Sequence, residues 1–355
     1  MYCVSRECNL VQELCTIRQA RMYARALFQD APCLRGQNTP LLDADLILSK
    51  LLAKPRAWIL AHQQDEIASV AHEFKRLVHL RCRGRALAYL TREKEFFGLR
   101  FRVTRATLIP KPDTELLVES VLAHVESQMM KPRSVSVHKD TSALPVLKIF
   151  EACTGCGCIA IALMHMLRAR GTPPLYVISS DICMRALAVA RYNARRLLDV
   201  SANSRVRFVH ADVRAPIPFF SPSEGTDVVQ ERGVCVPYDV ICANPPYVPS
   251  AQARALLQDG RGEPLGALDG GADGLDLVRA FAHHSAAALK EGGCVFCEVG
   301  SNHAQRAARI FQAAGFATVK ISKDLSGKER LISGILRSQS RAVTARRVAR
   351  VKHGD

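Results

Sequence analysis

The sequence predicts an α/β protein with a doubly wound parallel sheet and a separate bundle of helices before it. From residue 146 onward, short apolar segments alternate with helical ones, as in parallel βαβ units. Residues 1 to about 85 instead repeat apolar residues every three or four positions and show no strong strand pattern. A length of 355 residues also suits two domains better than one.

Two helices of the first domain are indicated by apolar residues at helical spacing, and each has one face to bury. The first set, which Pro55 follows, is Leu41, Ala44, Leu48 and Leu51. The second set is Ile67, Val70, Phe74 and Leu77. Beyond them, the stretch 95–103 combines a glycine with alternating apolar residues, which predicts a β-hairpin that links the two domains.

The second domain is expected to hold five strands with helices between them. The strands are predicted at residues 146–150, 175–179, 206–209, 238–243 and 293–298, and the two clearest helices at 159–167 and 185–197. Two polar stretches, 128–144 and 221–236, are interpreted as surface insertions. From Arg337 to the end, six basic residues and one acidic residue indicate a solvated tail or, alternatively, an arm for RNA.

Composition places the chain among ordinary globular proteins. Hydrophobic residues make up 48% and charged residues 23%, which excludes wholesale disorder and fibrous repeats. The formal net charge of +16 favours an anionic partner, either nucleic acid or an acidic protein. Aromatic residues at 6%, with one Trp, weigh against a surface that grips single strands by base stacking.

The expected compartment is the cytoplasm, without membrane association. No apolar run follows basic residues near Met1, so no signal peptide is visible. The longest apolar span, 152–167, is too short and too rich in glycine for a membrane helix. The 13 cysteines are scattered and odd in number, unlike those of a disulfide scaffold, and are expected to be reduced.

A glycine-containing turn, Glu151-Ala-Cys-Thr-Gly-Cys-Gly157, directly follows a predicted strand and opens a helix. Its glycines let a ligand approach the backbone closely, and the helix start offers free N–H groups. Asp181 ends the next strand, where a carboxylate can accept hydrogen bonds from ribose hydroxyls. The turn alone would fit NAD, FAD or a nucleoside, but the three-glycine dinucleotide spacing is absent. Because Glu151 would repel a pyrophosphate, a cationic ligand such as a sulfonium cofactor is favoured.

A second turn, Asn244-Pro-Pro-Tyr247, stands at the end of another predicted strand. Prolines lack an N–H and stiffen the turn, so it presents acceptors only. The Asn244 side-chain oxygen and the Pro245 carbonyl can therefore converge on one planar –NH2 group, with Pro246 holding the turn and Tyr247 lying flat against that group. The arrangement predicts a site that binds an amide or an exocyclic amine and aims its nitrogen.

Together these motifs resemble the HemK/PrmC family of bacterial methyltransferases that act on glutamine in peptide chain release factors. The resemblance spans nearly the whole chain and includes Leu42-Asp-Ala-Asp-Leu-Ile-Leu in the helical region. The stretches most specific to the family are Glu95-Phe-Phe-Gly-Leu99, Leu108-Ile-Pro-Lys-Pro-Asp-Thr-Glu115, Glu263-Pro-Leu-Gly-Ala-Leu-Asp-Gly-Gly-Ala-Asp-Gly-Leu275 and Asp324-Leu-Ser-Gly-Lys-Glu-Arg330. The fold it implies is a Rossmann-like class I methyltransferase sheet with a small amino-terminal helical bundle and a linking β-hairpin.

The resemblance also implies an S-adenosyl-L-methionine site and assigns roles to residues. Asp181 would bind the ribose, Asp212 and Val213 would lie near the adenine, and Asn244 to Tyr247 would hold the substrate glutamine. The full set of cofactor-binding residues is Glu151, Cys153, Thr154, Gly155, Cys156, Gly157, Asp181, Asp212, Val213 and Asn244. Two residues depart from the family turn, Asp-x-Gly-x-Gly-x-Gly: Glu151 replaces the Asp and Cys153 the first Gly, so Cys153 adds a side chain where the backbone dihedrals are special.

The implied organisation is a helical substrate-recognition domain at 1–88, a hairpin linker at 89–107, the methyltransferase domain at 108–337 and the basic tail at 338–355. No metal site is expected, because Cys153, Cys156 and Cys158 occupy the cofactor turn. Cys294 and Cys297, three apart in a strand, would point to opposite faces.

The predicted reaction is direct methyl transfer from S-adenosyl-L-methionine to the side-chain amide nitrogen of the glutamine in a release factor's Gly-Gly-Gln motif, with Asn244, Pro245 and Tyr247 as catalytic residues. This activity would support translation termination. The alternatives are an adenine N6 methyltransferase acting on RNA or DNA, a glutamine methyltransferase of a ribosomal protein, and a non-catalytic binder of release factors or RNA.

Overall fold

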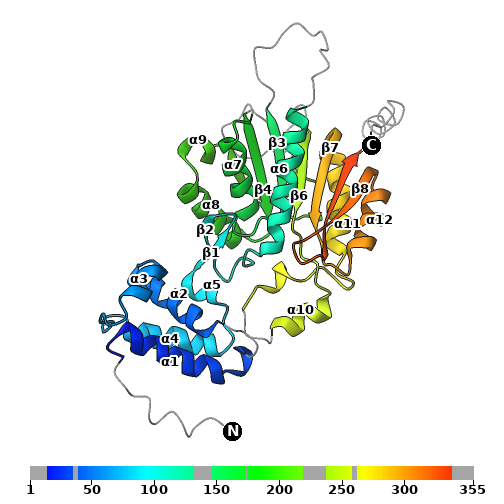
Figure 1. Cartoon of the computed structure of the whole chain (residues 1–355). Coiled ribbons are helices and arrows are strands. Elements are labelled where there is room, and N and C mark those ends of the chain that lie inside the picture. The colour runs from blue at the N-terminus through cyan, green and yellow to red at the C-terminus, as the bar shows by residue number, and fades with distance from the viewer. Residues whose placement is uncertain are drawn as a thin grey trace. The chain divides into compact units, whose positions relative to one another are not determined.

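The computed structural model describes residues 14–34, 39–130, 146–172, 174–218, 237–257 and 262–337. The chain divides into two compact units, Met1–Glu93 with Ala255–Gly262 and Lys94–Arg254 with Glu263–Asp355 (Figure 1). The predicted insertion at 221–236, the basic tail at 338–355 and nearly all of the predicted insertion at 128–144 lie outside the described residues. No helix in the described part of the chain is long and apolar enough to cross a membrane.

The first unit is helical, as the spacing of its apolar residues predicts. Its helices are α1 (Ile17–Asp30), α2 (Pro40–Leu52), α3 (Arg56–Ala61), α4 (Ala71–Cys82) and α5 (Leu87–Thr91). Ile17, Ile47, Phe74 and other apolar side chains from these elements form one core. The second predicted helix begins later than its pattern indicates. Ile67 is fully buried but precedes α4, because its N–H donates to the carbonyl of Cys15 at 2.9 Å instead of joining the helix.

A seven-stranded sheet forms the second unit, in the order β5-β4-β3-β6-β7-β9-β8. Its strands are β3 (Leu147–Ala152), β4 (Leu175–Asp181), β5 (Val206–His210), β6 (Tyr238–Ala243), β7 (Leu289–Glu298), β8 (Phe316–Lys323) and β9 (Glu329–Leu336). The first five in chain order are parallel, and β9 runs antiparallel to both of its neighbours. This sheet confirms the Rossmann-like class I methyltransferase fold and adds β8 and β9, which the sequence patterns did not indicate.

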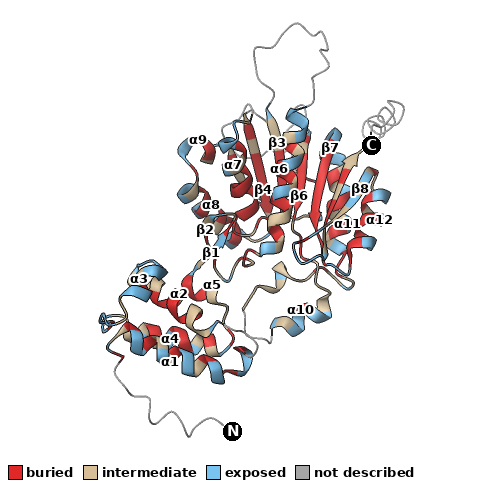
Figure 2. Ribbon diagram, in the orientation of Figure 1, coloured by how far each residue is buried: buried red, intermediate tan, exposed pale blue. Residues whose placement is uncertain are grey.

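Helices cover the sheet because alternate residues of its strands point to opposite faces. Phe150, Ile241 and Val295 share one core with residues of α11 (Asp276–Ala288) and α12 (Ala304–Ala313). Figure 2 shows the central strands of the sheet as largely buried. On the other face, Phe296 of β7 meets His124 of α6 edge to face. The helices of this unit are α6 (Glu115–Met129), α7 (Cys158–Ala169), α8 (Met184–Leu197), α9 (Val200–Asn203), α10 (Ser250–Leu257), α11 (Asp276–Ala288) and α12 (Ala304–Ala313).

The predicted hairpin is present as β1 (Glu93–Phe96) and β2 (Leu99–Arg102). Phe97 and Gly98 make the turn with φ of +52° and +74°, so both adopt the left-handed conformation that glycine tolerates best. The Glu115 carboxylate, at the start of α6, accepts the Phe97 N–H at 3.0 Å. The hairpin turn is thereby fastened to the segment that leads into the catalytic sheet.

Candidate active site

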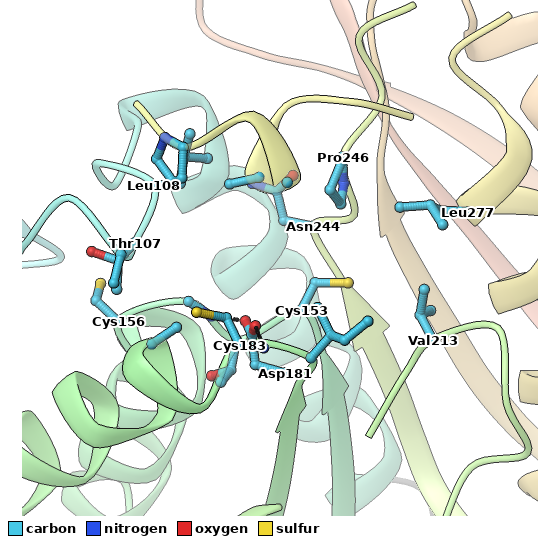
Figure 3. Close-up of a pocket in the computed structure, with 18 of the residues that line it drawn as sticks. Thr107, Leu108, Cys153, Cys156, Asp181, Cys183, Val213, Asn244, Pro246 and Leu277 are labelled. Carbon is cyan, nitrogen blue, oxygen red and sulfur yellow. Dashed lines mark hydrogen bonds between the residues drawn. The ribbon is translucent and has the colours of Figure 1, made fainter. Parts of the chain in front are cut away.

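The carboxyl ends of β3 and β6 lie side by side, at the point where the strand order reverses. Their parallel register sets Ala152 beside Ala243, so the turns that follow the two strands begin at the same edge of the sheet. Open α/β sheets bind ligands at such a switch point. A cavity of about 450 Å³ lies there, within the usual range for small-molecule sites (Figure 3).

The turn after β3 takes a backbone path that favours glycine. Cys153, Gly155 and Gly157 have φ of +59°, +58° and +83°. A Cβ on Gly157 would lie 3.1 Å from both Ala190 Cβ and Ile161 Cδ1, so this glycine allows α7 to pack closely against α8. The special backbone expected at Cys153 is therefore present, and a non-glycine residue occupies it.

Asp181, at the end of β4, braces this turn. One carboxylate oxygen accepts the Gly155 N–H and the other accepts the Cys183 N–H, both at 2.8 Å. Burial raises the pKa of Asp181, and these two backbone N–H groups oppose that shift. Each carboxylate oxygen has a second lone pair, so Asp181 can still accept from a ligand's hydroxyl groups in the cavity that it lines.

Glu151 lies behind the turn, fully buried, and does not itself line the cavity. Its Oε2 accepts the Thr154 hydroxyl at 2.7 Å. Its Oε1 has no hydrogen-bond partner of good geometry within the described residues, although Ser179 lies near enough to lower the pKa slightly. Burial outweighs these contacts and raises the pKa of Glu151 to about 7. A buried carboxylate with one unpaired oxygen is suited to a ligand that brings a positive charge or a donor.

The turn after β5 places a second carboxylate, that of Asp212, at the cavity. Asp212 and Val213 both line the cavity. The Asp212 carboxylate is held by the Arg214 guanidinium, with the closest contact at 2.6 Å, and this hydrogen bond lowers the pKa of Asp212. Figure 3 shows Val213 on the same side of the cavity as Leu277 of α11, so an apolar surface continues from the acidic one.

On the β6 side, the amide of Asn244 has a defined orientation. Its Nδ2 donates to the Thr114 hydroxyl oxygen at 3.0 Å. Because that contact uses the nitrogen, the carbonyl oxygen Oδ1 is left to accept from a ligand in the cavity that Asn244 lines. Pro246 also lines the cavity, and the buried Pro245 does not.

Tyr247, the last residue of this turn, has its hydroxyl bonded outside the cavity. It is not part of the cavity wall, and its hydroxyl donates to Glu298 Oε1 at 3.4 Å. Burial raises the pKa of Glu298, at the end of β7, to about 7. Thr114 and Glu298 are polar, buried residues next to the turn that the sequence patterns did not single out as functional. Thr114 belongs to the stretch 108–115, which resembles the family, but no chemical pattern in that stretch marked Thr114 as functional.

Glycines of the stretch 263–275 allow the turn after β6 to be braced by backbone. A Cβ on Gly270 would lie 2.7 Å from the Pro246 carbonyl oxygen, and one on Gly274 would lie 2.4 Å from that of Tyr247. The Val248 N–H donates to the carbonyl of Leu268 at 2.9 Å. The backbone of this stretch therefore approaches the backbone of the turn after β6 too closely for a side chain at Gly270 or Gly274.

The cavity brings together most of the residues chosen from the sequence. Those that line it are Cys153, Thr154, Gly155, Cys156, Asp181, Asp212, Val213, Asn244 and Pro246. Those outside its wall are Glu151, Gly157, Pro245 and Tyr247. Thr107, Leu108, Lys111 and Cys183 line it without having been chosen (Figure 3).

Several known proteins with similar sequences are named release factor glutamine methyltransferases. Residues 19–91 match the family model of the PrmC N-terminal domain. The chain is 33% identical to the release factor glutamine methyltransferase of Moorella thermoacetica, over 83% of this chain and 91% of that protein. It is also 33% identical to the release factor glutamine methyltransferase of Bordetella pertussis, over 85% of this chain and 97% of that protein.

Among solved structures, a release factor-specific protein-(glutamine-N5) methyltransferase from Alicyclobacillus acidocaldarius is 24% identical. The match covers 65% of this chain and 95% of that chain, with a TM-score of 0.33. These two sequence matches, at 33% identity over more than four fifths of this chain, decide the family. The chain belongs to the release factor glutamine methyltransferase family.

Proposed function

We propose that this protein transfers a methyl group from S-adenosyl-L-methionine to the side-chain amide nitrogen of the glutamine in the Gly-Gly-Gln motif of release factors. The observation that carries the proposal is the orientation of Asn244, whose Nδ2 is engaged by Thr114 while the residue lines the cavity. An outward carbonyl oxygen is an acceptor for an amide N–H. The proposed site of action is the cytoplasm, where release factors work.

The cavity suits the proposed cofactor on the β3 side. Asp181 is fixed by two backbone N–H groups and keeps lone pairs for ribose hydroxyls. The positive φ of Gly155 leaves the backbone open, and a Cβ there would meet nothing within 4 Å. Glu151 lies outside the cavity wall, and burial raises its pKa to about 7, so a nearby cationic ligand would favour its ionised form. When bound, S-adenosyl-L-methionine would supply an activated methyl group.

On the β6 side, the residues have to orient a poor nucleophile, because the lone pair of an amide nitrogen is delocalised into its carbonyl. Asn244 Oδ1 would accept one N–H of the substrate amide. The Pro245 carbonyl is the proposed acceptor for the other N–H, although Pro245 is buried and lies outside the cavity wall in this structure. These bonds would return electron density to the nitrogen and direct its lone pair into the cavity. Such positioning can contribute several kcal/mol, up to ~7–11 in favourable cases. No strong base is required first, since the proton can leave after the methyl arrives.

Incubation of the full chain with S-adenosyl-L-methionine and a purified release factor tests this function. Peptide mass spectrometry should place one methyl group on the glutamine of Gly-Gly-Gln, and a factor with glutamate at that position should remain unmodified. RNA, DNA and ribosomal proteins, offered in parallel, test the alternative substrates. Methylation of adenine in nucleic acid, with an unmodified release factor, would refute the proposal.

A further inference from the structure

The stretch 108–115 contacts each of the other family-specific segments through consecutive polar side chains. Lys111 Nζ lies 2.6 Å from Glu263 Oε1, and Asp113 Oδ2 lies 3.3 Å from an Arg330 guanidinium nitrogen. Thr114 accepts from Asn244, and Glu115 accepts from the Phe97 N–H. These side chains tie the stretch to the segments 263–275, 324–330, 244–247 and 95–99. Of the four, Thr114 touches the residue proposed to hold the substrate.

The Thr114 hydroxyl is one donor and an acceptor at once, so the direction of its bonds matters. The Thr114 hydroxyl oxygen accepts from Asn244 Nδ2 at 3.0 Å. The hydrogen of the same hydroxyl therefore has to bond a different partner. Thr114 is 2% exposed, so water does not supply that partner freely. The Glu298 carboxylate lies near the Thr114 hydroxyl, and its Oε2 has no hydrogen-bond partner of good geometry among the described residues. Burial raises the pKa of Glu298, and the neighbouring Thr114 hydroxyl opposes this shift.

Glu298 is itself held in place from several directions. It ends β7 on the same face of the sheet as Phe296, which packs on α6, and Thr114 stands directly before α6. Its Oε1 accepts the Tyr247 hydroxyl at 3.4 Å, and Arg330 provides a nearby positive charge. The direction of the contact between Asn244 and Thr114 follows from the amide itself. An amide nitrogen carries donors only, so Asn244 Nδ2 donates and the Thr114 hydroxyl oxygen accepts.

A side-chain amide can be reversed by rotation about its last bond, which exchanges oxygen and nitrogen. If Asn244 were reversed, its –NH2 group would face the substrate amide's own N–H groups and could accept neither. We propose that Thr114 is a positioning residue for the methyl transfer proposed above, because it holds Asn244 Nδ2 and so leaves Oδ1 for the substrate. Thr114 itself lines the cavity beside Asn244, and the proposed role is the orientation of Asn244.

Replacing the hydroxyl with a methyl group of similar size tests the inference. Thr114→Val should lower kcat on a release factor by about 10- to 100-fold, the range for groups that orient metal ligands in other sites. The affinity for S-adenosyl-L-methionine and the KM for the factor should stay within about threefold of the parental values. Thr114→Ser, which keeps the hydroxyl, should recover most of kcat. The matched control is Thr172→Val, which removes a hydroxyl bonded to the Leu167 carbonyl outside the cavity.

A double-mutant cycle separates positioning from a general structural role. In the Asn244→Ala background, Thr114→Val should change the remaining rate by no more than about twofold, because the residue it orients is already gone. Independent losses that multiply would overturn the inference. So would equal kcat losses in the Val and Ser variants, a parental kcat in Thr114→Val, or loss of cofactor binding in that variant. A parental enzyme inactive on release factors would instead refute the proposed function, and the inference with it.

Discussion

The two turns that flank the cavity end neighbouring strands, yet they are held in different ways. The turn after β3 depends on backbone conformation, with positive φ at Cys153, Gly155 and Gly157 and a buried, partly unpaired Glu151 behind it. The turn after β6 contains two prolines and is braced by partners from distant segments. Thr114 bonds its side chain, and the glycine-rich stretch 263–275 packs against its backbone.

This difference indicates what each turn can tolerate. A ligand that is only bound can be accommodated by a turn with some strain, since a modest loss of affinity is offset by ligand concentration. A nucleophile that has to be aimed depends on geometry, where an error of about 1 Å can cost about a hundredfold in rate. Substitutions after β3 should therefore change affinity or stability, and substitutions after β6 should change the rate.

The largest effect is expected for Asn244→Ala. Loss of the carbonyl acceptor should lower methyl transfer by about 10² to 10³, the scale for losing one preorganised electrostatic contact. Cofactor affinity, measured by calorimetry, should change much less, because Asp181 and the backbone of the β3 turn are untouched. A parental rate would mean that Asn244 is only a turn residue.

Asn244→Asp separates the two halves of the amide. Aspartate keeps an acceptor toward the substrate but cannot donate to Thr114, and it adds a negative charge. We expect a rate above that of the Ala variant and well below the parental rate. If Asp matched the parental enzyme, the donor contact to Thr114 would have no part in catalysis.

Asp181→Ala should have the next largest effect, on the β3 side. The loss of a charged acceptor should weaken S-adenosyl-L-methionine binding by about 1.5–3 kcal/mol. Gly155 and Cys183 also lose their backbone acceptor, so the turn should loosen as well. Calorimetry on the purified chain measures the affinity, and an unchanged value would remove Asp181 from the cofactor site. Asp181→Asn keeps one acceptor oxygen, so its affinity for S-adenosyl-L-methionine should lie between those of the parental chain and of Asp181→Ala.

The fold could be predicted from the sequence where the pattern is local. Alternation of strands and helices identified β3 to β7, and helical spacing identified α2. Antiparallel β8, at the edge of the sheet, and its neighbour β9 were missed because most of their residues are only partly buried, which weakens the apolar pattern. Ile67 misled the placement of α4 because a buried side chain in a loop looks like part of a helical stripe.

The site could be predicted in part for the same reason. A turn that directly follows a predicted strand, such as Asn244 to Tyr247, can be recognised as a candidate site from its place in the sequence. Partners that approach from far along the chain do not, since 130 positions separate Thr114 from Asn244. The proposed stacking of Tyr247 on the substrate amide stays a prediction, and its hydroxyl contact with Glu298 could be found only from the three-dimensional structure.

Glu151→Gln should change stability in a pH-dependent way. Burial raises the pKa of Glu151 to about 7 in the folded chain, so the protonated form is favoured there. Stability from this group is therefore full below its unfolded pKa, about 4.3, and is lost as pH rises through about 7. The Gln variant should be more stable than the parental chain at pH ~8, by on the order of 3–4 kcal/mol, and nearly equal at pH ~4. Urea unfolding of both proteins at the two pH values measures this, and parallel curves would contradict it.

The smallest effect is expected at Cys153, where strain and side chain can be separated. A left-handed conformation costs an L-residue roughly 1–2 kcal/mol, so Cys153→Gly should be more stable than Cys153→Ala by about 1 kcal/mol. Cofactor affinity of the Gly variant should remain within about threefold of the parental value or improve, because the backbone path is the one glycine prefers. Thermal unfolding and calorimetry on the three proteins measure both quantities. Equal stability of Gly and Ala would show that the φ of +59° carries no cost. A collapse of affinity in both would show instead that the thiol itself contributes to the site.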